Sequence, residues 1–270
     1  MFSTILSSVT VTGYLASALI IAFRLFQQEG NRRIPRNLGI GIALLAALGH
    51  GILLLGDVAG DRGLNLGFFS AASLVSWTIA LLILGSALTK PVENLGILLF
   101  PLAALTIFLG VRYSSAHFFS ADAPWGLRAH VLVSLLAYSV LTLASVQAVL
   151  LAIQDHHLRH RHPGGFIRAL PPLQTMETLL FEMIGVGFVL LSLALISGFM
   201  FLEDLFAQRL VHKTILSIAA WLVFGTLLTG RVRFGWRGQK ALIWTLVGFV
   251  VLMLAYFGSK FVIELLLGSN

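Results

Sequence analysis

The sequence predicts an all-α integral membrane protein with eight transmembrane helices joined by short loops. Of its 270 residues, 58% are hydrophobic and only 11% are charged, and the mean hydropathy is +0.94. A water-soluble domain carries about twice that share of charged residues. The apolar residues also fall into runs of about 20, which at 1.5 Å per residue is enough to cross a hydrocarbon core about 30 Å thick. Both observations place the chain in a lipid bilayer.

The first apolar run is MFSTILSSVTVTGYLASALIIAF, residues 1–23. It lacks a basic segment at its start, so we expect a retained helix and not a cleaved signal. Seven more spans are predicted at residues 38–56, 67–88, 95–111, 126–153, 178–201, 212–230 and 241–266. The gaps between spans hold the helix-breaking residues Gly30, Pro35, Pro91, Pro124, Pro163, Pro171 and Pro172. Because no gap could hold a soluble domain, we predict a single membrane domain over residues 1–270.

The basic residues predict the orientation, because Lys and Arg are retained on the cytoplasmic side of a membrane. Gaps one, three, five and seven hold twelve of them: Arg24, Arg32, Arg33, Arg36, Lys90, Arg159, Arg161, Arg168, Arg231, Arg233, Arg237 and Lys240. The other gaps with their borders hold five: Arg62, Arg112, Arg128, Arg209 and Lys213. Both termini are therefore expected outside, on the periplasmic side of a bacterial inner membrane that the chain crosses many times.

The net charge of +7 is explained by this inside bias and by attraction to anionic lipid headgroups. We therefore expect the bilayer as a partner and no nucleic acid. The chain has no cysteine, which excludes disulfides, a thiolate haem ligand and a covalent CxxCH haem site. It also has no GxSxG, HExxH or Walker A motif, so enzymatic activity is not expected.

Two histidines in or beside the apolar spans are the main functional candidates, because a polar group there costs folding free energy. His130 opens the span 126–153 near the outer headgroups, with Ser134 and Tyr138 four and eight residues later. These three side chains could line one groove between helices, with the neutral imidazole binding haem iron. The alternative is a structural histidine that bonds a neighbouring helix.

His50 lies between Gly49 and Gly51, so a flat macrocycle or a second helix could approach its backbone closely. The alternative is that the glycines only seat a helix, with His50 bonded to Ser70, Ser73 or Ser76. With span two running outward and span five inward, both histidines lie in the outer half of the bilayer. One haem bound by both His50 and His130 is the sharpest hypothesis.

The remaining polar groups predict structural roles. The tract DHHLRHRHPGG (155–165) could bind metal, but it carries no defined ligand spacing, so an inner-leaflet loop is favoured. His117 could be an alternative axial ligand, but its aromatic neighbours Phe118, Phe119 and Trp125 favour an anchor for that loop at the membrane interface. Glu177 is expected only to complement a helix dipole, and Glu182 to pair with Arg168 or Arg237.

The last third of the chain carries a recognisable order of motifs. Lys213 is followed by Trp221-Leu222-Val223, the turn Gly235-Trp236-Arg237-Gly238 and Tyr256-Phe257-Gly258. This order resembles the cytochrome c assembly protein family, the CcsA and CcmC group. Segments 49–77, 129–154 and 176–199 are similar to that family too, so the resemblance covers about residues 45–260.

The chain also departs from the family. The outer loop FMFLEDLFAQRLVH (199–212) lacks the tryptophan-rich WWD motif of haem-delivering members, Thr229 stands where a histidine is expected, and SKFVIELLLG replaces a second one. One member of each histidine pair is thus kept, a pattern similar to the divergent YpjD-type and HemX-type branch.

The resemblance implies an inner-membrane haem-handling protein of cytochrome c assembly. It would bind haem b through His50 and His130, with Ser134, Tyr138, Trp236 and Arg237 beside it, and would work with other biogenesis proteins. The alternative is a membrane scaffold or regulator without haem, acting in HemX-like control of tetrapyrrole synthesis or as an accessory to a transporter.

Overall fold

The computed structural model describes residues 2–27, 34–58, 64–113, 118–119, 123–160, 170–201, 211–258 and 261. Within these residues, eight helices are long and apolar enough to cross a membrane, which confirms the predicted number of spans. The long helices are α1 (Phe2–Phe26), α2 (Arg36–Val58), α3 (Phe68–Ser86), α4 (Gly96–Arg112), α5 (Trp125–Arg159), α6 (Leu173–Phe201), α7 (Val211–Phe234) and α8 (Gln239–Met253). The short 3₁₀ turn η2 (Glu93–Leu95) precedes α4, and the π-helical turn η4 (Leu254–Gly258) extends α8.

The helix ends depart from the prediction at α5, which continues to Arg159 instead of ending near residue 153. The loop predicted over residues 155–165 is therefore wrong for its first five residues. An ion pair between Arg159 and Asp155 joins successive turns there, and basic side chains in a last turn complement the helix dipole. Pro101 lies inside α4, where it cannot donate the helical hydrogen bond to the carbonyl four residues earlier.

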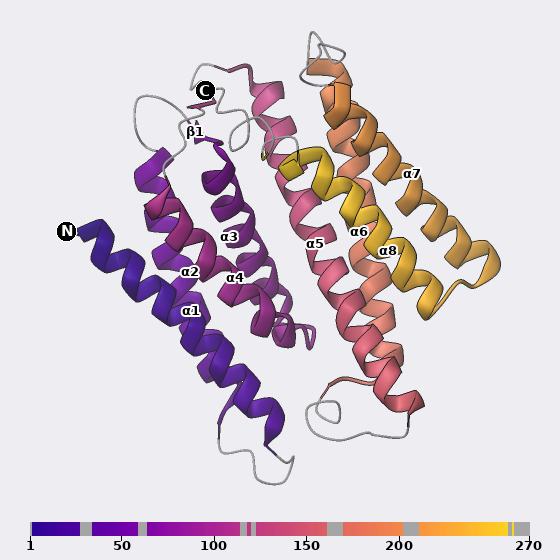
Figure 1. The fold of residues 1–270 in the computed structure, drawn as a ribbon, viewed down its shortest axis with the longest axis horizontal. Coiled ribbons are helices and arrows are strands. Elements are labelled where there is room, and N and C mark those ends of the chain that lie inside the picture. Colours follow the sequence, from indigo (N-terminus) through magenta and orange to yellow (C-terminus); the bar gives the residue numbers. More distant parts are fainter. Residues whose placement is uncertain are drawn as a thin grey trace. The chain divides into compact units, whose positions relative to one another are not determined.

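The helices form two compact units, residues 1–121 with 163–171 and residues 122–162 with 172–270. In unit 1, α1 and α3 each pack against both α2 and α4; in unit 2, α5 and α7 each pack against both α6 and α8 (Figure 1). Each unit is thus a ring of four helices. Their action as one membrane domain stays a prediction. A two-residue antiparallel pair, β1 (Leu64–Asn65) with β2 (Phe118–Phe119), is the described exception to an all-helical fold.

Close approach of α1 and α2 organises unit 1. A Cβ on Gly49 would lie 2.6 Å from the hydroxyl oxygen of Thr10, so only glycine fits at this crossing. One side chain also bridges the two helices, because Ser17 donates to the carbonyl of Gly39 at 2.8 Å. Small residues that bring helix backbones together are the usual basis of packing in a membrane.

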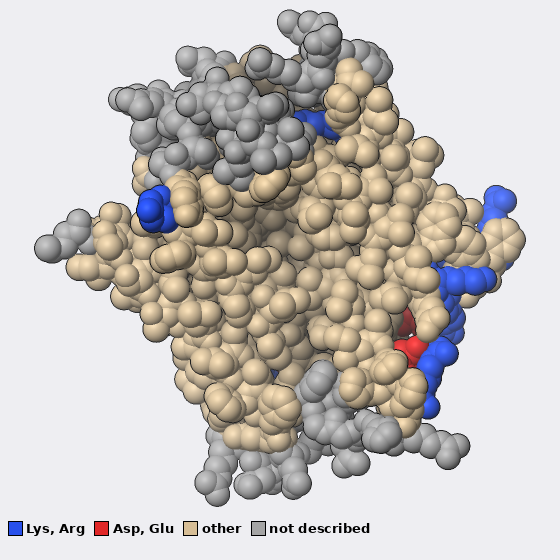
Figure 2. Space-filling model, in the orientation of Figure 1, with Lys and Arg blue, Asp and Glu red and all other residues tan. Residues whose placement is uncertain are grey.

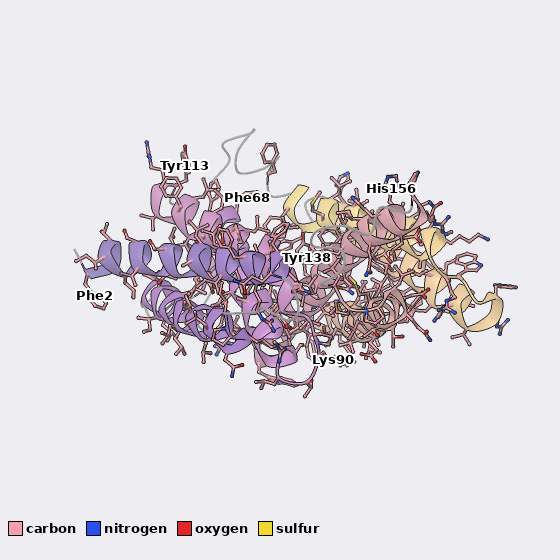
Figure 3. The ribbon with its side chains drawn as sticks, turned by 90° about the horizontal axis from the view of Figure 1, so that it is seen from below. Phe2, Phe68, Lys90, Tyr113, Tyr138 and His156 are labelled. Carbon is pink, nitrogen blue, oxygen red and sulfur yellow. The ribbon has the colours of Figure 1, made fainter. Side chains whose placement is uncertain are left out.

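Aromatic side chains close one end of unit 1. Phe69 at the start of α3 stacks on Tyr113, the residue that follows α4, with ring centroids 5.5 Å apart, and it meets Phe68 edge to face (Figure 3). At the opposite end of these helices, Glu93 accepts hydrogen bonds from Arg36 and lies 3.7 Å from Arg24. The buried carboxylate of Glu93 therefore lies at the end of the unit that carries Arg24 and Arg36.

In unit 2, Arg231, Arg233, Arg237 and Lys240 gather where α7 ends and α8 begins, and much of the remaining face in Figure 2 is uncharged. Large apolar side chains are exposed along these helices, among them Val186, Ile196, Leu222 and Ile243. Exposed apolar side chains along spanning helices are what a lipid environment requires.

Candidate functional site

His50 is held inside unit 1 by two side chains from other helices. It is 1% exposed, its Nδ1 lies 3.3 Å from the hydroxyl of Tyr14 on α1, and its Nε2 lies 2.8 Å from the hydroxyl of Ser73 on α3. One ring nitrogen donates and the other accepts in either tautomer. Both nitrogens are therefore engaged in joining α1, α2 and α3, and Ser73 is one of the three serines considered from the sequence.

The helix around His50 is shaped by its neighbours. A Cβ on Gly51 would lie 3.0 Å from the ring of Trp77 on α3, whose indole N–H donates to the carbonyl of Ala47. Gly49 admits Thr10 of α1 on the other side. The two glycines of the Gly-His-Gly segment thus seat helices α1 and α3 in this structure.

His130 is bonded differently, inside unit 2. Its Nδ1 lies 3.0 Å from the carbonyl oxygen of Ala194 and 3.1 Å from the hydroxyl of Ser197, both on α6. A carbonyl only accepts, so Nδ1 carries the proton and Nε2 carries the lone pair. The ring is half-buried, and no described residue bonds its Nε2. This is the arrangement in which histidines bind metals, with the second nitrogen held by a carbonyl.

Tyr138 lies two turns from His130 on α5 but contacts a different neighbour. Its ring packs against Phe249 of α8 and against Tyr256 and Phe257 of η4, with centroids 5.5 to 6.1 Å apart (Figure 3). His130 and Tyr138 therefore face α6 and α8 respectively, and the half-buried Ser134 lies between them along α5. The motif Tyr256-Phe257-Gly258 meets the predicted site residue Tyr138 through this aromatic cluster.

Trp236 and Arg237 form the turn between α7 and α8. Trp236 packs so closely on Gly230 that a Cβ there would clash with the indole, and its ring also contacts that of Trp244 with centroids 5.5 Å apart. Arg237 donates to both carboxylate oxygens of Glu177 at the start of α6, at 2.8 to 3.2 Å. Trp236 thus holds the turn against the end of α7, and Arg237 ties the turn to the start of α6.

Glu177 has a larger role than the helix-dipole complement expected from the sequence. Its carboxylate is buried, pairs with Arg237 and lies 3.5 Å from Arg231 at the end of α7. A buried charge is tolerated only when it is paired and hydrogen-bonded. The expected pairing of Arg237 with Glu182 is replaced by this pairing one turn closer to the helix start.

The predicted site residues of unit 2 do not form one cluster. His50 belongs to unit 1 and His130 to unit 2. Within unit 2, Glu177 and Asp155 line one pocket, and about 37 Å of α5 separates Asp155 from His130 at about 1.5 Å per residue. Since Arg237 is bound to Glu177, the turn with Trp236 lies at the far end of unit 2 from His130.

Tyr14 is the main functional partner that sequence reasoning missed. Thr10, Tyr14 and Ser17 follow one another at spacings of four and three, a polar stripe on one face of an apolar helix. This stripe of polar residues on an apolar helix is the sequence feature that could have predicted a buried polar contact. His117 and Arg168 lie outside the described residues.

Comparisons with known proteins agree with the resemblance seen in the motifs. The family described as cytochrome C assembly protein matches residues 39–267. Inner membrane protein YpjD of Escherichia coli strain K12 is 32% identical over 262 residues, which is 95% of this chain and 97% of the relative. The cytochrome c biogenesis protein CcsA of Trieres chinensis is 23% identical over 77% of this chain and 80% of its own.

A second CcsA, from Chlamydomonas reinhardtii, is 28% identical over 51% of this chain and 38% of the relative. No solved structure matches the chain significantly. The likeness to an inner-membrane relative and the eight apolar helices together identify a multi-pass inner membrane protein. The family match covers both helical units, and the chain belongs to the cytochrome c assembly protein family.

Proposed function

We propose that this protein binds haem b in the inner membrane as part of cytochrome c assembly, with Nε2 of His130 as an axial ligand. The observation that carries the proposal is the hydrogen bond from Nδ1 of His130 to the carbonyl of Ala194. It assigns the proton to one nitrogen and directs the lone pair of the other away from α6.

The surroundings of His130 fit a haem group. The ring is half-buried at the start of α5, which allows access from outside the helix packing. Two turns farther along α5, on the side of α8, Tyr138 packs against Phe249, Tyr256 and Phe257, and this aromatic cluster supports the helix that carries His130. When bound, haem supplies an iron that can exchange one electron. The protein's part is to hold the imidazole neutral and oriented through Ala194 and Ser197.

That His50 is a second haem ligand stays a prediction. To bind iron it must give up one of its two hydrogen bonds, and the contact with Tyr14, at 3.3 Å, is the longer. The scaffold alternative has support of its own, because His50, Trp236 and Arg237 all have structural partners. We therefore place His130 first among the predicted ligands, with Trp236 and Arg237 in structural roles.

We also propose that both termini face the periplasm. Basic side chains at the helix ends support this orientation, because Lys and Arg are retained on the cytoplasmic side of a membrane. The residues at the ends assigned to the cytoplasm are Arg24, Arg36, Lys90, Arg159, Arg231, Arg237 and Lys240. In this orientation His130 lies near the outer surface, where haem is needed for a cytochrome assembled outside the membrane.

The test is the absorption spectrum of the full-length protein, purified in mild detergent and incubated with haem b. We expect a Soret band and reduced α-band from the wild type, and at least about tenfold weaker haem binding by His130→Ala. His212→Ala, which removes an exposed histidine at the start of α7, should bind as the wild type does.

Two results would contradict haem binding through His130: a colourless wild type after incubation, or an unchanged affinity in His130→Ala. A colourless wild type favours the scaffold alternative. His50→Ala separates one ligand from two, because a shared site requires its spectrum to change as well.

A further inference from the structure

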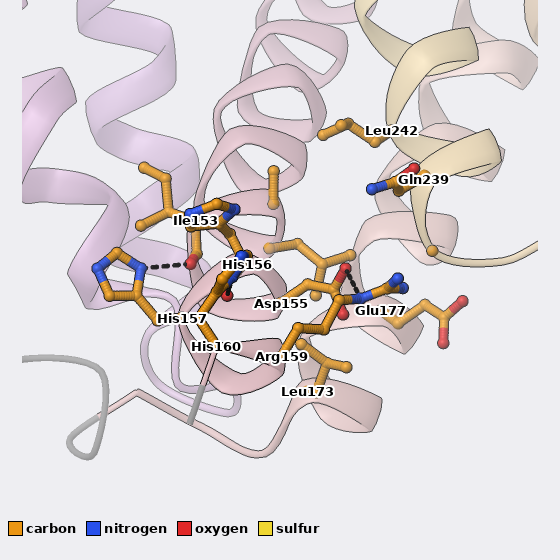
Figure 4. A pocket seen from close by; sticks show the side chains of 13 residues that line it. Ile153, Asp155, His156, His157, Arg159, His160, Leu173, Glu177, Gln239 and Leu242 are labelled. Carbon is orange, nitrogen blue, oxygen red and sulfur yellow. Dashed lines mark hydrogen bonds and ion pairs between the residues drawn. The ribbon is translucent and has the colours of Figure 1, made fainter. Parts of the chain in front are cut away.

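One pocket of unit 2 lies far from His130 and is not used by the proposed function. It has a volume of about 600 Å³ and lies among the last turns of α5 and the starts of α6 and α8 (Figure 4). All of its lining residues belong to unit 2. Pockets that bind small molecules have volumes of about 300–1,000 Å³. This pocket is therefore large enough for a ligand much larger than a single ion or water molecule.

The wall of the pocket changes from apolar to polar toward the ends of two helices. Along α5 it runs from Leu151 to His156 and Arg159, and along α8 it runs from Leu242 to Gln239 at the helix start. At about 1.5 Å per residue, Leu151 and Arg159 are about 12 Å apart along the axis of α5. The pocket is thus amphipathic, with its apolar part toward the middle of the helices and its polar part at their ends.

Aromatic and basic side chains mark this end of unit 2 as a membrane surface. The ring of Trp236 contacts that of Trp244 with centroids 5.5 Å apart, and Nζ of Lys240 lies 5.9 Å from the centroid of the Trp236 ring. Tryptophan is enriched where the hydrocarbon core meets the lipid headgroups. Gly238 and Gln239 of the pocket wall follow Trp236 within three residues. The polar part of the pocket therefore lies at the level of the headgroups.

The charges at the polar part of the pocket leave an excess of positive groups. The carboxylate of Glu177 is shared by two guanidiniums, those of Arg231 and Arg237. Asp155 is paired with Nε of Arg159 at 2.9 Å, and the side chain of Arg159 is 62% exposed. A guanidinium has five N–H donors, so the terminal nitrogens of Arg159 can still donate to an anion. Both carboxylates of the pocket wall are thus compensated, and the surplus charge around them is positive.

We propose that this pocket binds an acidic glycerophospholipid, with the lipid phosphate at Arg159 and the first part of an acyl chain against Leu151 and Leu242. Basic pockets between transmembrane helices hold the headgroups of acidic lipids. The anionic headgroup matches the surplus positive charge, and the acyl chain matches the apolar part of the wall. A soluble phosphate would leave that apolar part unfilled, and a zwitterionic lipid carries a positive charge of its own that the arginines repel. The bound lipid joins α5, α6 and α8 at this membrane surface.

The test is lipid binding to the delipidated full-length protein in a neutral detergent, measured by native mass spectrometry. We expect the wild type to bind one phosphatidylglycerol more tightly than one phosphatidylcholine. One basic residue at an acidic lipid surface changes the affinity about fivefold, so Arg159→Gln should bind phosphatidylglycerol about fivefold more weakly. Asp155→Asn removes a carboxylate that repels the phosphate and should bind this lipid more tightly. Glycerol phosphate at the same concentration should not displace the lipid.

Arg233→Gln is the matched control, since it removes an exposed basic residue from the same end of unit 2 but outside the pocket wall. It should bind phosphatidylglycerol as the wild type does. Equal affinity of the wild type for the two lipids, or equal weakening in Arg233→Gln and Arg159→Gln, would overturn the site. Displacement by glycerol phosphate would also overturn it, because the occupant would then be a soluble phosphate. Haem binding by Arg159→Gln should match that of the wild type, so failure of either proposal leaves the other standing.

Discussion

At the scale of single residues, the two candidate histidines differ in their hydrogen bonds. His50 uses both nitrogens to hold Tyr14 and Ser73, whereas His130 uses one nitrogen for Ala194 and Ser197. The first pattern stabilises a helix junction, and the second leaves a lone pair for a ligand. A histidine in or beside an apolar span is a functional candidate in both cases, and their hydrogen-bond partners separate the structural role from the binding role.

Ser73→Ala tests the structural role of His50. The change leaves a buried imidazole nitrogen without its 2.8 Å partner, and an unsatisfied buried polar group costs about 1–3 kcal/mol. We expect the free energy of unfolding in detergent, measured by denaturant titration, to fall by that amount. Ser70→Ala, one turn earlier on α3, is the control and should have little effect. Equal stability of the two variants would show that the Ser73 contact does not stabilise unit 1.

At the scale of elements, the α7–α8 turn shows how a recognisable motif acts structurally. Gly235 and Gly238 have φ of 64° and 56°, a region that favours glycine. Between them Trp236 packs on Gly230, and Arg237 reaches Glu177 on α6. Unit 1 has a similar device, in which Glu93 meets Arg24 and Arg36. In each unit a buried glutamate thus ties one helix start to a neighbouring helix hairpin.

The hydrogen bonds and the charge of Glu177 raise the pKa of Arg237 above its already high usual value. A group whose pKa is raised in the folded state stabilises the fold below its unfolded pKa. That contribution is lost only when the pH rises through the folded pKa. The guanidinium therefore stays charged throughout the neutral and mildly alkaline range, and its bond to Glu177 is not a pH switch there.

Glu177→Gln removes the charge that two arginines share while keeping the side-chain shape. Because the carboxylate is buried and paired, we expect the thermal unfolding temperature to fall by several degrees. Glu182→Gln, an exposed glutamate on the same helix, should change it little. An unaltered unfolding temperature in Glu177→Gln would mean that the turn is held by Trp236 packing alone.

At the scale of the whole molecule, two rings of four helices account for the eight spans. The family match runs through both rings. Each ring contains one of the two candidate histidines. Each unit also exposes large apolar side chains outward, because hydrocarbon, unlike water, surrounds the helices.

The absence of cysteine makes the orientation directly testable, since each introduced cysteine is the only thiol in the chain. Thr89→Cys and Gln239→Cys lie at exposed sites of the predicted inner side, and Ser3→Cys and Tyr113→Cys at the outer side. In intact spheroplasts, a membrane-impermeant maleimide should label the last two and spare the first two until the membrane is permeabilised. The reverse pattern would show that both termini face the cytoplasm.

The sequence by itself determined the membrane environment, the number of spans and the family. These depend on apolar run length and on motif order, both of which are local along the chain. The extension of α5 to Arg159 was not predicted, because the charged residues there suggested a loop. In the structure an i to i+4 ion pair and the dipole at the helix end stabilise these charged residues within the helix.

Only the tertiary structure decided what each candidate residue touches. Tyr14 and Ser73 lie 36 and 23 residues from His50, and Ala194 lies 64 residues from His130. Arg237 meets Glu177 across 60 residues. A hydrogen bond depends on position and direction in space, which helix packing sets and residue spacing along one helix does not. For this reason the sequence made both histidines candidate haem ligands, and only their packed neighbours distinguish the structural histidine, His50, from the proposed ligand, His130.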